Sequence, residues 1–185
     1  MEYIPVIMLA DDLTEIPVYN LPEGFQAKTY RNGDECEWAR IEHSVGEFKS
    51  RDDALKHFNI EFGPFLSEFQ ERCFFIEIGN GEKIATATAW YNTDFLGKRY
   101  GRLHWVAVIP EYQGKKLGKP LVHLALERMK RFHDCVYLTT QTTSQPAVNL
   151  YLDFGFVPFV EDTESLRGWR ILAKHLRHPK LKDFE

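Results

Sequence analysis

The sequence predicts an α+β fold in which helices flank one central mixed β-sheet. Strand-like runs and helical periodicities are interspersed along the chain, and three strand-like runs follow one another in its middle. The 185 residues suffice for a single domain with a sizeable core. The predicted order is strand, two helices, three strands, helix, strand, helix and two strands. This order excludes a doubly wound sheet, in which strands and helices alternate throughout.

The first part of the predicted domain contains one strand and two helices. Residues 25–30 favour a strand, and residues 38–45 place apolar side chains three and four positions apart, as on one helical face. A second helix begins near Ser50, a typical N-cap residue followed by an acidic first turn. Gly63 and Pro64 must break or kink this helix, because proline lacks the amide hydrogen that a helix interior needs.

The remaining elements are mostly strands. The Asn80-Gly81 pair favours the positive φ angles of a tight hairpin between two β-favouring runs. Apolar residues on one face indicate a helix over residues 116–132, and Pro146 and Gly155 delimit a short helix over residues 144–154. The predicted strands of this part are residues 73–78, 83–92, 100–109, 136–140, 156–160 and 169–174.

We expect three regions along the chain. Residues 1–24 form an N-terminal extension, residues 25–174 the folded domain, and residues 175–185 a polar, mostly basic tail. The tail is expected to be solvated, as chain ends usually are.

Composition and charge narrow the classes of partner. The net charge of −4 gives no overall basic excess, so we expect neither nucleic acid nor a membrane as a partner. Cys36, Cys73 and Cys135 have no metal-ligand spacing and fit buried thiols in a reducing compartment. The N-terminal apolar run is too short for a membrane span and lacks the features of a signal peptide. We therefore expect a cytoplasmic protein without a bound metal.

The most informative stretch is LHWVAVIPEYQGKKLGK at residues 103–119, where a strand passes through a glycine- and lysine-bearing loop into a helix. The first turn of a helix leaves N–H groups without partners and carries the positive end of the dipole, so it stabilises an anion. The loop matches neither the Walker A nor the G-x-G-x-x-G pattern. Two interpretations remain from this stretch alone: a phosphate site and a solvated lysine-rich turn.

Two motifs together resemble the GNAT family, the N-acetyltransferases that use acetyl-CoA. VAVIPEYQGKKLGK at residues 106–119 is similar to the acyl-CoA signature of the family, and AVNLYLDFGF at residues 147–156 is similar to its later L-Y-x-x-x-G-F motif. One helix and one short strand separate the two motifs, as in the family. The resemblance implies the acyl-CoA N-acyltransferase fold from about residue 25 to residue 174, with acetyl-CoA as the acyl donor.

The chain departs from the family at two positions. The family pattern Arg/Gln-x-x-Gly-x-Gly/Ala places Gln113 first and Gly118 last, but Lys116 stands where the middle glycine is usual. Glycine is favoured where a ligand approaches the backbone closely. The Lys116 side chain must therefore point away from the pyrophosphate, or the backbone approach is altered, or Lys116 adds a phosphate contact. Ser144 replaces a frequent asparagine at the start of the later helix and remains a good N-cap.

The resemblance also implies a cofactor role for each part of the first motif. Backbone groups of Val106 and Val108 would pair with the pantetheine arm, N–H groups of residues 113–119 would hold the pyrophosphate, and Lys115 or Lys119 would reach the adenosine phosphate. The expected cofactor-binding set is Val106, Ala107, Val108, Gln113, Gly114, Lys115, Lys116, Leu117, Gly118 and Lys119.

Two residues are the main candidates for proton transfer. Tyr151 matches the tyrosine that, in many family members, donates a proton to the departing CoA thiolate; the alternative is a core tyrosine on an apolar helical face. The attacking ammonium must first lose a proton, and His104 is the first candidate base because strand alternation gives it one face with Val106 and Val108. A merely packed histidine is the alternative, and Glu111 in the loop is a weaker candidate.

Further residues are candidates for the acceptor side. Residues 139–143 end a strand and are rich in threonine, although threonine also favours strands for its own sake. The aromatic candidates for a pocket wall, which also suit the core, are Phe62, Phe65, Trp90, Tyr91 and Trp105.

The resemblance implies direct acetyl transfer to a primary amine of a small molecule or a peptide, without a covalent acyl-enzyme. Two alternatives remain: a non-catalytic acyl-CoA-binding or sensing module, and an interaction protein that keeps only the fold. A homodimer is an option, because dimers are frequent in the family.

Overall fold

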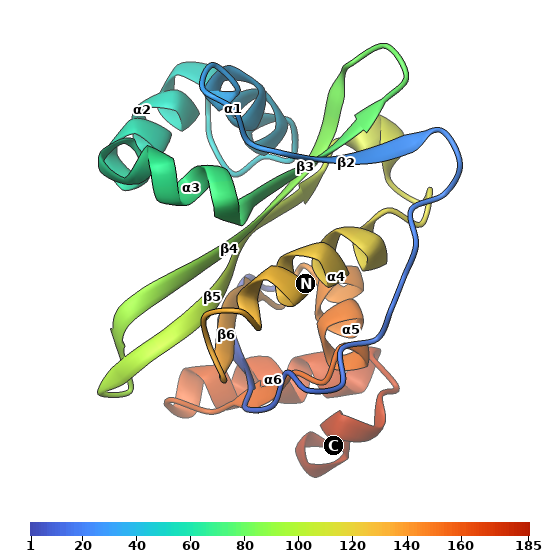
Figure 1. Cartoon of the computed structure of the whole chain (residues 1–185). Coiled ribbons are helices and arrows are strands. Elements are labelled where there is room, and N and C mark those ends of the chain that lie inside the picture. The colour runs from blue at the N-terminus through green and yellow to red at the C-terminus, as the bar shows by residue number, and fades with distance from the viewer. The chain divides into compact units, whose positions relative to one another are not determined.

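The computed structural model describes residues 1–185 (Figure 1). The strands are β1 (Pro5–Ala10), β2 (Phe25–Thr29), β3 (Cys73–Ile78), β4 (Lys83–Phe95), β5 (Lys98–Val108), β6 (Val136–Gln141) and β7 (Val157–Phe159). The α-helices are α1 (Glu35–Ser44), α2 (Arg51–Glu61), α3 (Leu66–Arg72), α4 (Gly118–Met129), α5 (Gln145–Asp153) and α6 (Thr163–His175). Short 3-10 helices cover η1 (Gly63–Phe65), η2 (Pro110–Tyr112) and η3 (Pro179–Phe184).

The strands form one mixed sheet of seven, in the order β2-β3-β4-β5-β6-β1-β7. β5 and β6 are parallel, with Gly101 opposite Val136, whereas β1 is antiparallel to both β6 and β7. β2 and β4 are each antiparallel to β3. The α+β class with a mixed sheet and flanking helices is therefore confirmed.

The chain divides into two compact units. The α4 unit comprises residues 18–91 and 103–132, and the α5 unit comprises residues 1–17, 92–102 and 133–185. β4 and β5 contribute residues to both.

In the α4 unit, the core is built by aromatic side chains from α1, α2, α3 and the sheet. Trp38 is fully buried, and its ring centroid lies 5.3 Å from that of Phe58 and 6.0 Å from that of Phe62. The start of α2 agrees with the sequence prediction, since the Ser50 hydroxyl accepts from the Asp53 N–H at 3.1 Å. The predicted break at Gly63 and Pro64 is confirmed, because η1 separates α2 from α3.

In the α5 unit, the N-terminal segment supplies an inner strand. β1 lies between β6 and β7, with Pro5 opposite Gln141 and Ile7 opposite Phe159. Ile4, Val6 and Met8 are buried. The apolar run at the start of the chain thus completes this part of the sheet.

The predicted strand over residues 169–174 is wrong, because these residues belong to helix α6. Asp162 caps the helix: its carboxylate accepts from the Ser165 N–H at 2.7 Å, and the Ser165 hydroxyl accepts from the Asp162 N–H at 3.0 Å. The buried residues of α6 recur at helical spacing; they are Ser165, Gly168, Trp169, Leu172 and Ala173. A short window of apolar residues does not separate a helix from a strand, whereas this longer periodicity does.

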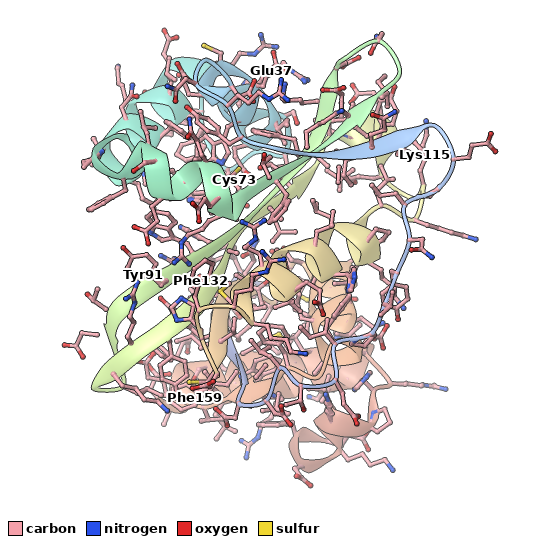
Figure 2. All side chains as sticks on the ribbon, in the orientation of Figure 1. Glu37, Cys73, Tyr91, Lys115, Phe132 and Phe159 are labelled. Atoms are coloured by element: carbon pink, nitrogen blue, oxygen red, sulfur yellow. The ribbon has the colours of Figure 1, made fainter.

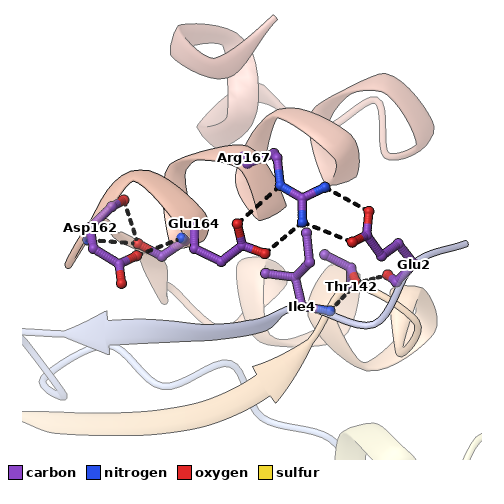
Figure 3. A network of polar contacts seen from close by, with 7 residues as sticks. Glu2, Ile4, Thr142, Asp162, Glu164 and Arg167 are labelled. Carbon is purple, nitrogen blue, oxygen red and sulfur yellow. Dashed lines mark hydrogen bonds and ion pairs between the residues drawn. The ribbon is translucent and has the colours of Figure 1, made fainter.

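Helix α6 is joined to the start of the chain by a network of polar contacts (Figure 3). The Arg167 guanidinium donates to both carboxylate oxygens of Glu2, at 2.6 and 2.9 Å, and to the carboxylate of Glu164. The Thr142 hydroxyl accepts from the Ile4 N–H at 3.0 Å and donates to the Glu2 carbonyl. The segment preceding β1 is therefore held by hydrogen bonds both to α6 and to Thr142.

The expectation of a solvated C-terminal tail is wrong for Lys180 and Leu181, whereas Lys182 is exposed as expected. Leu181 of η3 is fully buried, and the Lys180 ammonium donates to the carbonyls of Leu152 and Phe156 at 3.0 and 3.3 Å. Leu152 lies in the last turn of α5, where cations suit the helix dipole. Burial lowers the pKa of Lys180.

The cysteines fit the expectation of buried thiols in part. All three are free, but only Cys73 is buried, whereas Cys135 is half-buried and Cys36 is exposed. Burial raises the pKa of the Cys73 thiol to about 12. No helix combines the length and the apolar character that a membrane span requires.

Candidate active site

The loop that leads into α4 is anchored to the end of β5. The Gln113 side-chain amide donates to the Val108 carbonyl at 2.9 Å, and the Gln113 N–H donates to the Pro110 carbonyl. The Tyr112 ring packs edge-on against Phe25 of β2, with centroids 6.2 Å apart. The strand end, η2 and the loop therefore form one fixed segment.

The backbone conformation of this loop shows how Lys116 fits at the position where the family pattern has glycine. Gly114 and Lys116 have φ angles of 76° and 63°, in the left-handed region. Leu117 follows in the right-handed helical region, with φ −84° and ψ −25°. Lys116 thus has the backbone conformation for which glycine is favoured. Its side chain is exposed.

A left-handed residue followed by a right-handed one turns successive N–H groups toward one concave side, which suits an anion. This arrangement directly precedes the first turn of α4, which begins at Gly118 and adds the positive end of a helix dipole. The loop thus has the backbone geometry of a phosphate site.

Lys115 of the loop and Lys119 of the first turn of α4 each lie near an aromatic ring. The Lys115 ammonium lies 4.2 Å from the centroid of the Tyr112 ring, and the Lys119 ammonium lies 5.1 Å from that of Tyr19 (Figure 2 labels Lys115). Both contacts have the distance of a cation–π interaction. Leu117 is buried and fixes the start of α4, whereas Gln113, Gly114, Lys115 and Lys116 are exposed.

Upstream of the loop, β5 is not a regular strand. Trp105 has a φ angle of 51°, which is rare for a bulky residue and interrupts the alternation of side chains. Ala107 is buried, while Val106 and Val108 are half-buried. Spacing alone therefore does not establish the shared face that the sequence suggests for His104, Val106 and Val108.

The irregularity brings two adjacent side chains to one carboxylate. Glu61, the last residue of α2, accepts at Oε1 from His104 Nε2 at 2.9 Å and at Oε2 from Trp105 Nε1 at 2.9 Å. His57, one turn earlier in α2, contacts the same Oε2 through Nε2 at 3.0 Å. Sequence analysis missed Glu61; the glutamate four residues after His57 is the only local pattern that points to it.

The Glu61 carboxyl is ionised at neutral pH. Burial by itself raises its pKa, but the hydrogen bond and charge of His104, with the bonds from Trp105 and His57, hold the pKa at about 2. The side chains are partly enclosed, with exposed fractions of 11% for His104, 21% for Glu61 and 43% for His57. Aromatic rings surround the group: the Trp105 ring centroid lies 5.3 Å from those of Trp38 and Phe48.

The five aromatic residues expected to wall a pocket or fill the core fall into different environments. Phe62 and Trp90 are buried and pack at 5.1 Å, so they belong to the core. Phe65 is exposed, Trp105 is half-buried beside Glu61, and Tyr91 donates its hydroxyl hydrogen to Glu68 at 3.0 Å.

Tyr151 lies in helix α5 of the α5 unit, whereas His104 and the loop lie in the α4 unit. Its ring is buried and packs at 6.0 Å from Phe156, whose N–H donates to the Tyr151 carbonyl at 3.1 Å. Gly155 has a φ angle of 96°, which only glycine adopts readily and which ends the helix. Ser144 begins α5 without a side-chain capping bond; its hydroxyl instead accepts from Gln141.

The other candidates have lesser support from the structure. Glu111 is exposed in η2. Within residues 139–143, Thr142 is buried and serves the polar network around Glu2 and Ile4. No group of three or more histidine, cysteine or carboxylate side chains is placed to hold a metal ion.

Comparison with protein-family models gives a match to the acetyltransferase (GNAT) family over residues 33–156. This range covers the strand, the loop and α4, and it ends with the L-Y-x-x-x-G-F motif.

Among curated proteins, the chain is similar to mycothiol acetyltransferase of Streptomyces griseus, with 28% identity over 151 residues, 78% of this chain and 46% of that protein. It is also similar to N-alpha-acetyltransferase 30 of Saccharomyces cerevisiae, with 36% identity over 58 residues, 31% of this chain and 33% of that protein. The chain thus spans less than half the length of these relatives.

Solved structures share the fold. A GCN5-related N-acetyltransferase from Sphaerobacter thermophilus superimposes with a TM-score of 0.65 at 18% identity, over 85% of this chain and 49% of that one. Glucosamine-6-phosphate N-acetyltransferase from Arabidopsis thaliana gives 0.57 at 19% identity, over 76% of this chain and 97% of that one. With the family match over residues 33–156, these findings show that the chain belongs to the GNAT family of acetyltransferases.

Proposed function

We propose that the chain transfers the acetyl group of acetyl-CoA directly to a primary amine. The observation that carries the proposal is the backbone of the loop before α4, where Lys116 keeps a left-handed conformation despite its side chain. Retention of this conformation supports a phosphate-binding role for the N–H groups of residues 113–119. GNAT proteins generally use acetyl-CoA, whose pyrophosphate would occupy such a loop.

The proposed reaction has two proton transfers. A base removes a proton from the acceptor ammonium, and the free amine attacks the thioester carbonyl. The carbon–sulfur bond then breaks, and Tyr151 protonates the departing CoA thiolate. His104 is the proposed base, since a histidine exchanges protons near neutral pH. The support for Tyr151 is its place in the L-Y-x-x-x-G-F motif.

The acceptor is a primary amine of a small molecule or of a peptide. The names of the similar proteins point to different acceptors, so a panel should include an amino sugar, a polyamine, a peptide with a free N-terminus and a lysine peptide. Release of free CoA thiol with one of them, detected by a thiol reagent, is the expected result.

Substitution of Tyr151 by phenylalanine tests the proton donor. Loss of a general acid lowers kcat by about 10²- to 10⁴-fold, whereas CoA affinity measured by calorimetry stays close to that of the wild type. Tyr137→Phe is the matched control, because Tyr137 is also buried in the α5 unit and its hydroxyl only accepts from Asn92. Unchanged turnover in Tyr151→Phe would contradict the role of Tyr151. CoA binding without transfer to any amine would instead favour a non-catalytic acyl-CoA-binding module.

A further inference from the structure

The Glu61 carboxylate joins two imidazoles and an indole from two elements of the α4 unit. It accepts from His57 within its own helix and from His104 and Trp105 on β5. A carboxylate has about four acceptor positions, so three donors nearly saturate it. Such a group is fixed in place by its partners and fixes them in return.

The charge of Glu61 determines which nitrogen of His104 carries the hydrogen. An ionised carboxylate only accepts hydrogen bonds, so the nitrogen that faces it at 2.9 Å must be a donor. In neutral His104, the hydrogen therefore resides on Nε2, and Nδ1 is the nitrogen that takes up a proton.

We propose that Glu61 is the positioning residue for the base, holding His104 with its hydrogen on Nε2 and compensating the charge that His104 gains. The proposal rests on the proposed function and adds a residue to it. When Nδ1 accepts the proton of the acceptor ammonium, the ring becomes an imidazolium, and its positive charge lies beside the Glu61 anion. His57 contacts the second oxygen, Oε2, and so holds the carboxylate plane.

The main-chain conformation at Trp105 contributes to the same arrangement around Glu61. Regular alternation would send neighbouring side chains of β5 to opposite faces. The φ angle of 51° at Trp105 accompanies a geometry in which His104 and Trp105 both reach Glu61. A left-handed conformation at a bulky residue costs about 1–3 kcal/mol and persists where surrounding contacts support it. The bonds of His104 and Trp105 to Glu61 are such contacts.

The test uses Glu61→Gln in the full chain with acetyl-CoA and an accepted amine. We expect kcat/KM to fall at least about tenfold, with CoA affinity unchanged. The acidic limb of the pH profile should move to lower pH, because loss of the carboxylate charge removes the stabilisation of the imidazolium. Glu61→Asp should restore part of the rate. Glu37→Gln is the control, since Glu37 also lies in the α4 unit and binds Arg40 at 2.8 Å.

A second measurement does not depend on turnover. Nitrogen-15 NMR of the imidazole rings should show His104 of the wild type with its hydrogen on Nε2, and a mixture of both forms in Glu61→Gln. His104 with its hydrogen on Nδ1 in the wild type would overturn the proposal, as would coincident pH profiles of the wild type and Glu61→Gln. A chain that binds CoA but acetylates no amine would contradict the proposed function itself, whereas an active chain with an unchanged Glu61→Gln profile contradicts only the role of Glu61.

Discussion

Lys116 shows that a lysine can adopt the backbone conformation that usually calls for glycine. A left-handed conformation costs an ordinary residue about 1–2 kcal/mol relative to glycine. The chain sustains this cost at Lys116, in the same loop in which Gly114 has a φ angle of 76°. An exposed lysine therefore occupies this position with a left-handed backbone.

Substitution of Lys116 by glycine and by valine separates backbone from charge. Lys116→Gly removes the conformational cost but makes the unfolded chain more flexible, so we expect a stability within about 1 kcal/mol of the wild type. Lys116→Val should destabilise the protein by more than about 1 kcal/mol, because a β-branched residue is a severe outlier at positive φ. Urea unfolding measures both, and calorimetry with CoA checks that only the valine variant loses affinity markedly. Equal stability of the two variants would contradict this account.

Candidate site residues could be predicted from the sequence where they lie within a local motif. They could not be predicted where the contact joins residues far apart in the sequence. The loop, Tyr151 and His104 could be named from local patterns. Glu61 could not be assigned, because its partners His104 and Trp105 lie 43 and 44 residues away in the sequence. His104 and Trp105 are adjacent in the strand, and their shared contact with one carboxylate depends on the left-handed backbone at Trp105. The residue types around Trp105 do not predict this conformation.

At the scale of elements, helix α6 packs closely because it lacks a side chain at one position. A Cβ atom added at Gly168 would lie 2.9 Å from Cγ1 of Val6 and 3.0 Å from Cγ2 of Ile4. Both neighbours are β-branched and stiff, and both belong to the buried N-terminal segment. Gly168 therefore sets the distance between α6 and this segment.

Gly168→Ala tests this close approach. Alanine favours the helix by about 1 kcal/mol over glycine, but overpacking costs about 1–3 kcal/mol, so we expect a net loss of stability. The control is Gly63→Ala, because Gly63 has open space around its Cβ position and no positive φ. Thermal or urea unfolding should show a lower midpoint for Gly168→Ala and not for Gly63→Ala. A stabilised Gly168→Ala variant would show that the segment yields at little cost.

Most elements could be predicted because turn residues bound them. Ser50, Gly63-Pro64, Asn80-Gly81 and Gly155 each mark an observed boundary. The fold of α6 was missed because its capping residue, Asp162, lies seven positions before the apolar run that suggested a strand. The packing of η3 was missed because Leu181 is a single apolar residue in a polar segment, and its burial depends on tertiary contacts.

At the scale of the whole molecule, the half-buried Glu61 and the buried Glu42 make stability depend on pH in opposite senses. The pKa of Glu61 is held at about 2, below its ordinary value of 4.5, despite the opposing effect of burial. Glu42 is fully buried, and burial together with the nearby Glu47 raises its pKa well above 4.5. Its Oε1 has no hydrogen-bond partner.

The free energy of unfolding should show both effects when each glutamate is replaced by glutamine. For Glu61, the stability contribution is present above pH 4.5 and is lost as pH falls toward 2, because the unfolded state binds a proton first. For Glu42, the contribution is present below pH 4.5 and declines as pH rises, because the folded state keeps its proton. Urea unfolding from pH 3 to pH 8 measures each difference between wild type and variant. Slopes of the same sign would contradict the two assignments.

The place of β1 in the sheet has a consequence for synthesis on the ribosome. The Ile4 N–H bonds the hydroxyl of Thr142, 138 residues later, and β1 pairs with β6 and β7. A strand whose partners are translated long after it cannot join its sheet during early elongation, and such long-range pairing slows folding. The nascent chain therefore carries an unpaired apolar strand at least until its neighbour β6, residues 136–141, has been synthesised.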